Sequence, residues 1–396
     1  MGDTTSDKGT FYGGPPLTLL SPVEAARKRP GMYIGSTDQA GLQSMLWEVV
    51  IHSLNEHLAG TADYVAIRLE ADGAVTVSNN GPGIPTEVGD GATPTLEVAL
   101  TAYSDTPAIA GVYKVAQPWS REFLWVANAL SSFLVAEVQR GGYLWRQEYE
   151  RGVPRAEVRP IERTTTTGTS ITFWPDTTIF TDVSLDCDLL VERVRATCYL
   201  NRGLTAEVTD ARAYPAAIWS FHFSDGVRAY VRHLTGIRAA LHSPIAVRTV
   251  MGTTTIDVAL QYNYGDARNV LSFVNNYPTW DDGSHVTGFY SALVRVLNDR
   301  GRAVTTGGTD SIMENGSLTE QDVQTGLSAV ISVWLAQPSF EGATKMKLRA
   351  DEVGEQISAA VTNGLVRHFM QEPEDLKRIV RHCHAGHMRQ MPGGLE

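Results

Sequence analysis

The chain is short of cysteine and has no long apolar run. Its three cysteines, Cys187, Cys198 and Cys383, are odd in number and far apart, which argues against a disulfide framework and predicts a reducing compartment. No apolar stretch approaches the ~20 residues of a membrane-spanning helix. The polar N-terminus lacks the charged start and apolar core of a secretory signal. We therefore expect a cytoplasmic protein with no membrane partner.

A surplus of basic residues is also missing. The net charge is −11 and the sequence pI is about 5.4, so we do not expect nucleic acid as a partner. Hydrophobic residues make up 43% of the 396 residues and charged residues 19%, which are ordinary proportions for a globular protein. That length predicts two domains, each with a core of its own.

Hydrophobic periodicity predicts alternating helices and strands. Apolar residues at helical spacing indicate a helix at 41–59, and two alternating segments, 64–70 and 74–78, indicate a hairpin across Asp72-Gly73. Residues 1–16 read as an arm with Phe11 and Tyr12 as its large apolar residues. The remaining expected helices lie at 95–103, 183–200, 224–234, 284–299 and from 351 onward, and the remaining strands lie around 133–150, 169–174, 254–263, 270–275 and 327–336.

Glycine is missing from one segment where its absence matters. Residues 22–56 and the NNGPGIPT loop at 79–86 read like the walls of an ATP pocket, but the following segment 113–131, YKVAQPWSREFLWVANALS, contains no glycine. Phosphate cradles need glycine, because only a bare backbone brings several N–H groups close to an anion. The sequence predicts a pocket that keeps its walls and lacks its phosphate cradle.

Six segments in chain order carry a family pattern. They are RKRPGMYIG (27–35), the helix at 48–60, GPGIP (81–85), TGTSITFWPD (167–176), FVNNYPTWDDGSHVTGF (273–289) and ATKMKL (343–348). Together they resemble the N-terminal ATPase half of bacterial DNA gyrase B subunits, from about residue 22 to about 381. The resemblance implies an α/β fold. A GHKL-type (Bergerat) α/β sandwich at 17–215 would follow the arm at 1–16 and precede a smaller α/β transducer-like domain at 216–392.

The resemblance also bears on activity. The metal-binding, DNA-cleaving domain that follows in a full gyrase B subunit has no counterpart in this sequence. We therefore expect no topoisomerase activity from this chain by itself. Either the sequence is a fragment of a longer protein or it is a free-standing relative.

Glu48 and His52 are the candidate catalytic residues. Glu48 falls on the family's general base, which activates water against the terminal phosphate. His52, one helical turn later, falls where the family has the Asn that holds magnesium, and Mg²⁺ prefers oxygen ligands to imidazole. We therefore do not expect ATP or magnesium as cofactors. An acid–base pair is one interpretation; a solvated Glu and a locally hydrogen-bonded His are the other.

Other family pocket positions are partly kept. Asn79 replaces the Asp that accepts a hydrogen bond from the adenine amino group, and Pro82 replaces an Arg that reaches toward the residue at Glu56. Arg140 and Thr169 are retained. The resemblance therefore implies a reshaped ligand pocket in which adenine binds more weakly.

The glycine run of the family is replaced by AQPWSREF at 116–123, with matching flanks. Pro118 removes an N–H donor, and Trp119, Phe123 and Trp125 add bulk and apolar surface. Arg121 remains able to meet an anion. These residues are expected in the wall of the pocket.

Two features lie toward the C-terminus. Lys345 corresponds to the family's transducer lysine that reaches the terminal phosphate, although a surface Lys on a loop is an equal interpretation. The histidines around Cys383, at 382, 384 and 387, match no zinc pattern. We expect a solvated tail and no metal site.

Three functions remain open. One is acid–base chemistry (cyclisation, dehydration or isomerisation) on a non-phosphorylated small molecule of specialised metabolism, bound in the former ATP pocket. A second is a catalytically inactive gyrase B paralogue that acts as a binding, decoy or inhibitor-resistance protein. A third is a divergent ATPase of the gyrase B type. A homodimer through the N-terminal arm is expected in each case.

Overall fold

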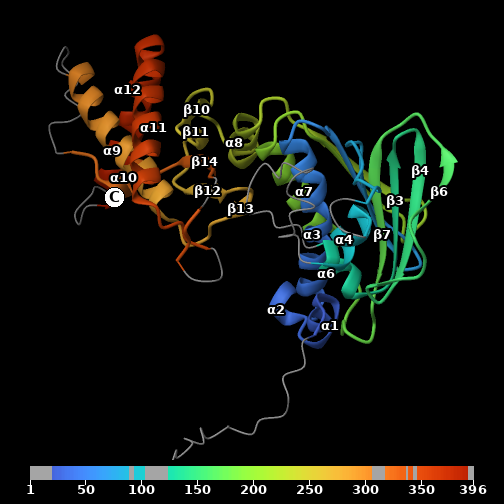
Figure 1. Ribbon diagram of the computed structural model, residues 1–396. Coiled ribbons are helices and arrows are strands. Elements are labelled where there is room, and N and C mark those ends of the chain that lie inside the picture. The colour runs from blue at the N-terminus through green and yellow to red at the C-terminus, as the bar shows by residue number, and fades with distance from the viewer. Residues whose placement is uncertain are drawn as a thin grey trace, which may run out of the picture.

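The computed structural model describes residues 20–88, 93–102, 124–305, 317–335, 338–341 and 346–390, without the side chains of 303–305 and 387–390. Within these ranges the chain forms two α/β units that lie side by side (Figure 1). No helix in the described ranges is long and apolar enough to cross a membrane.

A nine-stranded sheet forms the base of the first unit. The strands are β1 (Tyr64–Leu69), β2 (Val75–Asn79), β3 (Ser131–Arg140), β4 (Tyr143–Glu150), β5 (Val153–Pro154), β6 (Arg159–Arg163), β7 (Gly168–Pro175), β8 (Thr205–Asp210) and β9 (Ala217–His222). Their order is β5-β4-β3-β7-β2-β1-β8-β9, with β6 also paired to β4. The predicted β1–β2 hairpin is confirmed as an antiparallel pair, and β1 and β8 are parallel.

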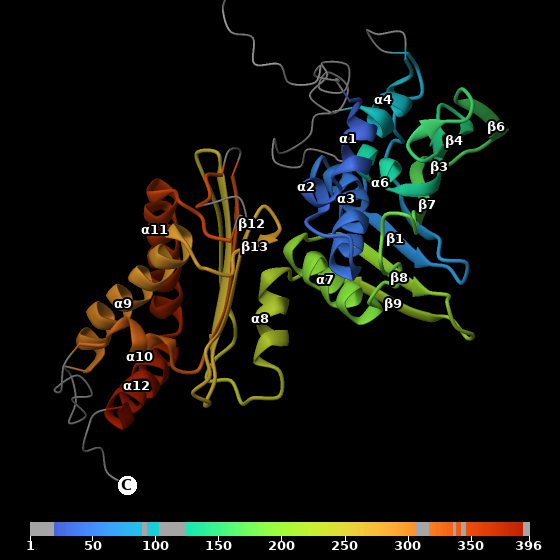
Figure 2. The ribbon, with the colours of Figure 1, turned by 90° about the horizontal axis from the view of Figure 1, so that it is seen from below.

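Helices cover one face of this sheet (Figures 1 and 2). They are α1 (Pro22–Lys28), α2 (Gly31–Ile34), α3 (Gln39–Leu58), α4 (Thr95–Thr101), α6 (Leu124–Ala129) and α7 (Cys187–Leu200). The predicted helix at 41–59 is α3. It starts at Asp38, whose carboxylate accepts hydrogen bonds from the N–H groups of Ala40 and Gly41 and so satisfies donors that the first turn leaves unpaired. Most of α3 is buried, which fixes its side chains in place.

The second unit is a five-stranded sheet between helices. Its strands are β10 (Ile245–Met251), β11 (Thr254–Tyr262), β12 (Asn269–Val274), β13 (Tyr277–Pro278) and β14 (Leu327–Trp334), in the order β10-β11-β14-β12-β13. The helices are α8 (Val227–Thr235), α9 (Ser284–Thr305), α10 (Glu320–Gln324), α11 (Asp351–Gln371) and α12 (Pro373–Gln390). Figure 2 shows α8 on the face toward the first unit and α9 and α11 on the opposite face.

The long helices α9 and α11 approach each other closely where two glycines meet. A Cβ on Gly288 would lie 2.1 Å from the carbonyl oxygen of Gly354, so only glycine allows this backbone contact. The sequence predicted a helix at 284–299 and another from 351 onward, and both are confirmed.

An aromatic cluster joins the two units. Tyr199 at the end of α7 stacks on Phe223 and on Tyr230 of α8, with ring centroids 3.7 Å and 4.6 Å apart. The same cluster includes Phe273 of β12. The first sheet continues through β9 to His222, a few residues past the expected boundary at 215. The division into domains at 215 and 216 stays a prediction.

Candidate ligand pocket

Helix α3 carries both candidate catalytic residues. Glu48 and His52 lie one turn apart, on the same side of the helix, because residues i and i+4 are neighbours. His52 is only 2% exposed, and Glu48 is half-buried. A buried imidazole and a half-buried carboxylate one turn apart form the kind of pair that moves protons in enzymes.

The loop after β2 is tied to the same helix. The Asn79 amide nitrogen donates to Ser53 Oγ at 3.0 Å, and Asn79 Oδ1 accepts from the Gly81 N–H at 2.9 Å. Asn79 is 8% exposed. Its side chain therefore holds the loop at 79–86 against α3, and Oδ1 already accepts one hydrogen bond.

Close packing fixes the next part of this loop. Gly83 has a φ of +79°, and a Cβ there would lie 2.8 Å from Val138 Cγ1 and 2.9 Å from the Gln139 carbonyl oxygen of β3. Both the backbone angle and the space require glycine. The loop is thus held against the sheet at Gly83 and against α3 at Asn79.

The two retained family positions support the loop from the sheet side. Arg140 Nη1 donates to the carbonyl oxygens of Pro82 and Gly83, at 3.4 Å and 3.2 Å. Thr169 Oγ1 accepts from the Ile84 N–H at 3.2 Å and is 3% exposed. The structure therefore brings Asn79, Pro82, Arg140 and Thr169 together around one loop. Their place in a ligand pocket stays a prediction.

Glu56 is a buried carboxyl beside this loop. It is 3% exposed, and Thr61 Oγ1 donates to its Oε2 at 2.5 Å. Its Oε1 has no hydrogen-bond partner among the described residues. A Cβ on Gly81 would lie 3.3 Å from Glu56 Cδ, so the carboxyl directly adjoins the loop. A buried oxygen without a donor costs stability, and a bound N–H group would satisfy it.

Of the aromatic residues expected in the pocket wall, only Trp125 lies within the described residues. Trp125 is fully buried in the core and packs edge-on against Tyr33, with ring centroids 5.2 Å apart. That position favours a packing role, and its place in a pocket wall stays a prediction. Trp119, Arg121, Phe123 and Lys345 lie outside the described residues.

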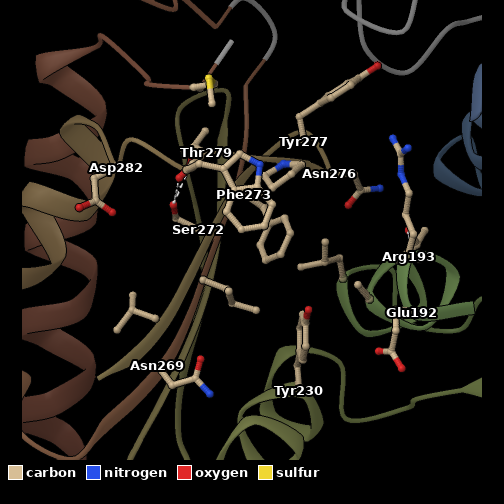
Figure 3. A pocket seen from close by; sticks show the side chains of 18 of the residues that line it. Glu192, Arg193, Tyr230, Asn269, Ser272, Phe273, Asn276, Tyr277, Thr279 and Asp282 are labelled. Atoms are coloured by element: carbon tan, nitrogen blue, oxygen red, sulfur yellow. Dashed lines mark hydrogen bonds between the residues drawn. The ribbon is translucent and has the colours of Figure 1, made fainter. Parts of the chain in front are cut away.

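A cavity of about 1000 Å³ lies between the two units, next to α3. Ser44 and Trp47 line it from α3. Figure 3 shows Arg193 of α7 on one side and residues of strands β12 and β13, from the second unit, on another. Burial lowers the pKa of Arg193 to about 10, and the neighbouring Tyr277 and, to a smaller extent, the negative charge of Glu48 oppose this shift. Arg193 therefore stays charged at neutral pH, and its guanidinium lies in the field of the candidate general base.

Tyr277 faces the same region from β13 (Figure 3). Burial raises the pKa of its phenol, and the Glu48 carboxylate raises it further. Glu48, Arg193 and Tyr277 thus form one electrostatic group contributed by both units. Arg193 and Tyr277 were not predicted from the sequence, because a basic residue on an amphipathic helix and a tyrosine in a two-residue strand carry no pattern that points to a site.

The expected solvated tail is wrong. Residues 373–390 form α12, and Cys383 is 0% exposed in the second core. Burial raises the pKa of its thiol to about 12. Among the described residues no group of His, Cys, Asp or Glu side chains is arranged to hold a metal ion.

A helical layer on a mixed sheet, with the loop at 79–86 (called the ligand loop below, after its predicted role) held between helix α3 and the sheet, is the arrangement of a GHKL-type fold. The family model for DNA gyrase B matches residues 226–391. A crystal structure of the 43K ATPase domain of Thermus thermophilus gyrase B, in complex with an aminocoumarin, is 30% identical and superimposes with a TM-score of 0.80, covering 93% of this chain and 95% of that one.

Further relatives agree. The topoisomerase IV ATP-binding domain of Francisella tularensis is 26% identical, with a TM-score of 0.74 over 94% of this chain and 99% of that one. The DNA gyrase B protein of Halalkalibacterium halodurans is 37% identical over 93% of this chain and 58% of its own length. The chain belongs to the DNA gyrase B family and corresponds to the N-terminal part of it. It spans a little over half the length of that curated relative.

Proposed function

We propose that this gyrase-B-like protein carries out acid–base chemistry on a small, non-phosphorylated molecule in the former ATP pocket, between α3 and the loop at 79–86. We also propose that it does not hydrolyse Mg-ATP. The observation that carries the proposal is His52, a buried imidazole on the same face as Glu48. Imidazole is a poor ligand for Mg²⁺ and a good group for proton transfer near neutral pH. The segment at 116–123, where glycine would be needed for phosphates, supports the same conclusion from the sequence.

The proposed roles follow from the surroundings of each group. Arg193 lies near Glu48, and a cation favours the ionised form of a carboxylate. Glu48 would therefore take a proton from the substrate, and His52 would return one to a second atom. Such a transfer changes no oxidation state and suits cyclisation, dehydration or isomerisation. Glu56 Oε1 lies buried beside the ligand loop and would accept an N–H from the substrate.

Calorimetry with Mg-ATP tests the first half of the proposal. We expect no magnesium-dependent binding at micromolar nucleotide, since His52 is the wrong ligand type. The variant His52→Asn restores an amide oxygen and is the matched probe of this one position. Micromolar affinity with magnesium dependence in the unmodified protein, together with steady ATP turnover, contradicts the proposal.

Deuterium incorporation tests the second half even while the substrate is unidentified. A small-molecule extract of the source cells is incubated with the protein in D₂O and followed by mass spectrometry for new or labelled products. Glu48→Gln and His52→Ala should each slow the reaction by roughly 10²-fold or more. Glu162→Gln, an exposed carboxylate on β6, is the control and should not. Full activity in both pocket variants means that the pair is merely inherited.

A second candidate is a binding or decoy protein that takes up a gyrase inhibitor. The observation in its favour is that Arg140 and Thr169 hold the ligand loop in place, so a binding surface can persist without catalysis. The Thermus thermophilus relative was solved with an aminocoumarin bound. Micromolar binding of an aminocoumarin, with no turnover in the deuterium experiment, would favour this candidate. A divergent ATPase is the outcome if Mg-ATP binds and turns over.

A further inference from the structure

The cavity between the two units is lined in part by aromatic side chains, which come from both units. Figure 3 shows Tyr230 of α8 on one side and Phe273 and Tyr277 on the β12–β13 side. Trp47 of α3 and the exposed Trp280 also line the cavity. Asn269, Ser272, Asn276 and Thr279 add amide and hydroxyl groups. A volume of about 1000 Å³ is at the upper end of small-molecule pockets, and aromatic walls with a few polar groups are their usual composition.

Arg193 is the charge in this cavity that lacks an ionic partner. Its guanidinium carbon lies 3.8 Å from the centre of the Trp47 ring, and no described residue forms a salt bridge with it. The other charged lining residues are paired. Arg268 lies 3.5 Å from Asp282, and Glu192 accepts from Arg195 at 2.7 Å. The cavity therefore presents one available guanidinium, held flat against an indole.

The negative charge of Glu48 stabilises the charged form of Arg193, but the two side chains form no ion pair among the described residues. The guanidinium also donates no hydrogen bond to a described residue, so its N–H groups can bind another acceptor. A guanidinium stacked on a ring still presents its edge, and that edge matches a carboxylate with two parallel hydrogen bonds. Tyr230 and Phe273 are buried in one cluster, with ring centroids 6.2 Å apart, whereas Tyr277 is partly exposed and Trp280 is exposed. A planar aromatic group attached to such a carboxylate would therefore lie against Tyr277 and Trp280.

We propose that this interdomain cavity binds an aromatic carboxylate, with Arg193 as the anchor for the carboxyl group and with Tyr277 and Trp280 beside the ring. A single guanidinium between apolar walls suits a carboxylate better than a phosphate, which needs more donors. The site is separate from the loop at 79–86 and does not depend on the proposed function. Because both units line it, an occupied cavity stabilises their present arrangement.

Calorimetry with naphthoate, benzoate and indole acetate as probes tests the assignment, with naphthamide as the uncharged counterpart of naphthoate. We expect saturable binding of at least one acid, and binding of naphthamide at least 10-fold weaker than that of naphthoate. Arg193→Gln should weaken acid binding by about 10- to 100-fold, the loss of a hydrogen bond to a charged group. Arg195→Gln, two residues along the same helix, is the matched control and should change it less than twofold.

Two further measurements distinguish this interdomain site from the pocket between α3 and the loop at 79–86. Glu48→Gln should leave acid binding intact or tighten it a few-fold, because it removes a negative charge near Arg193. Hydrogen exchange with naphthoate bound should show protection in α7 and in β12–β13 together. Absence of saturable binding by all three acids, equal binding of naphthoate and naphthamide, or equal effects of the Arg193 and Arg195 variants would each overturn the proposal. A loss of binding in Arg193→Gln counts only if its melting temperature matches that of Arg195→Gln. Where it does not, Arg193→Lys replaces it and should weaken naphthoate binding, because an ammonium lacks the two parallel donors of a guanidinium. Naphthoate binding as tight in Arg193→Lys as in the unmodified protein refutes the anchor.

Discussion

The ligand loop offers a prediction whose size follows from the structure. In Gly83→Ala the new methyl meets two obstacles. The φ of +79° costs an L-residue roughly 1–2 kcal/mol. The Cβ would also lie 2.8 Å from Val138 Cγ1 and 2.9 Å from the Gln139 carbonyl oxygen, and overpacking of this kind costs about 1–3 kcal/mol. We expect a loss of about 2–5 kcal/mol in the free energy of unfolding.

Gly141→Ala is the matched control for this variant. Gly141 also has a positive φ, of +63°, but a Cβ there would meet nothing within 4 Å. Its replacement should therefore cost only the backbone part, about 1–2 kcal/mol. Urea denaturation followed by tryptophan fluorescence measures both variants. Equal destabilisation of the two proteins, or no destabilisation in Gly83→Ala, would refute the close packing of the loop against β3.

Three other predictions concern charge, thiol reactivity and assembly. Burial opposes ionisation of Asp176, but hydrogen bonds from Thr178 and Arg27 outweigh it and lower its pKa to about 2, below the unfolded value of about 3.9. The ionised Asp176 carboxylate therefore adds to the free energy of unfolding above about pH 4, and this contribution is lost as the pH falls toward 2. In Asp176→Asn the free energy of unfolding should fall less steeply with decreasing pH in this range. An unchanged acid dependence would contradict this. Cys383, whose pKa burial raises to about 12, should react with a maleimide only as fast as the second unit opens, and rapid labelling in the folded state, seen by mass spectrometry, would be the contrary result. Light scattering should give the same dimer with and without nucleotide if the arm at 1–16 joins two copies independently of ATP, and a nucleotide-triggered dimer would contradict that expectation.

Much of the architecture was predictable because it follows from local pattern. The 3.6-residue period of apolar residues predicted α3, and alternation on either side of Asp72-Gly73 predicted the β1–β2 hairpin. Family motifs predicted that Asn79, Pro82, Arg140 and Thr169 belong to one ligand pocket, which stays a prediction. The structure places them around one loop. The segment around Cys383 was misjudged as a solvated tail, because its histidines suggested solvent, whereas Cys383 packs into a core.

The sequence by itself determined which chemical groups these segments carry: a carboxylate and an imidazole one turn apart on α3, and no glycine between residues 113 and 131. Only the tertiary structure decided what surrounds them. Arg193 comes from α7 and Tyr277 from β13, far along the chain from Glu48, and they meet because the second sheet packs against the helical layer of the first. The environment of a charge depends on neighbours that are distant in sequence, so no local pattern could place this group or the cavity beside it.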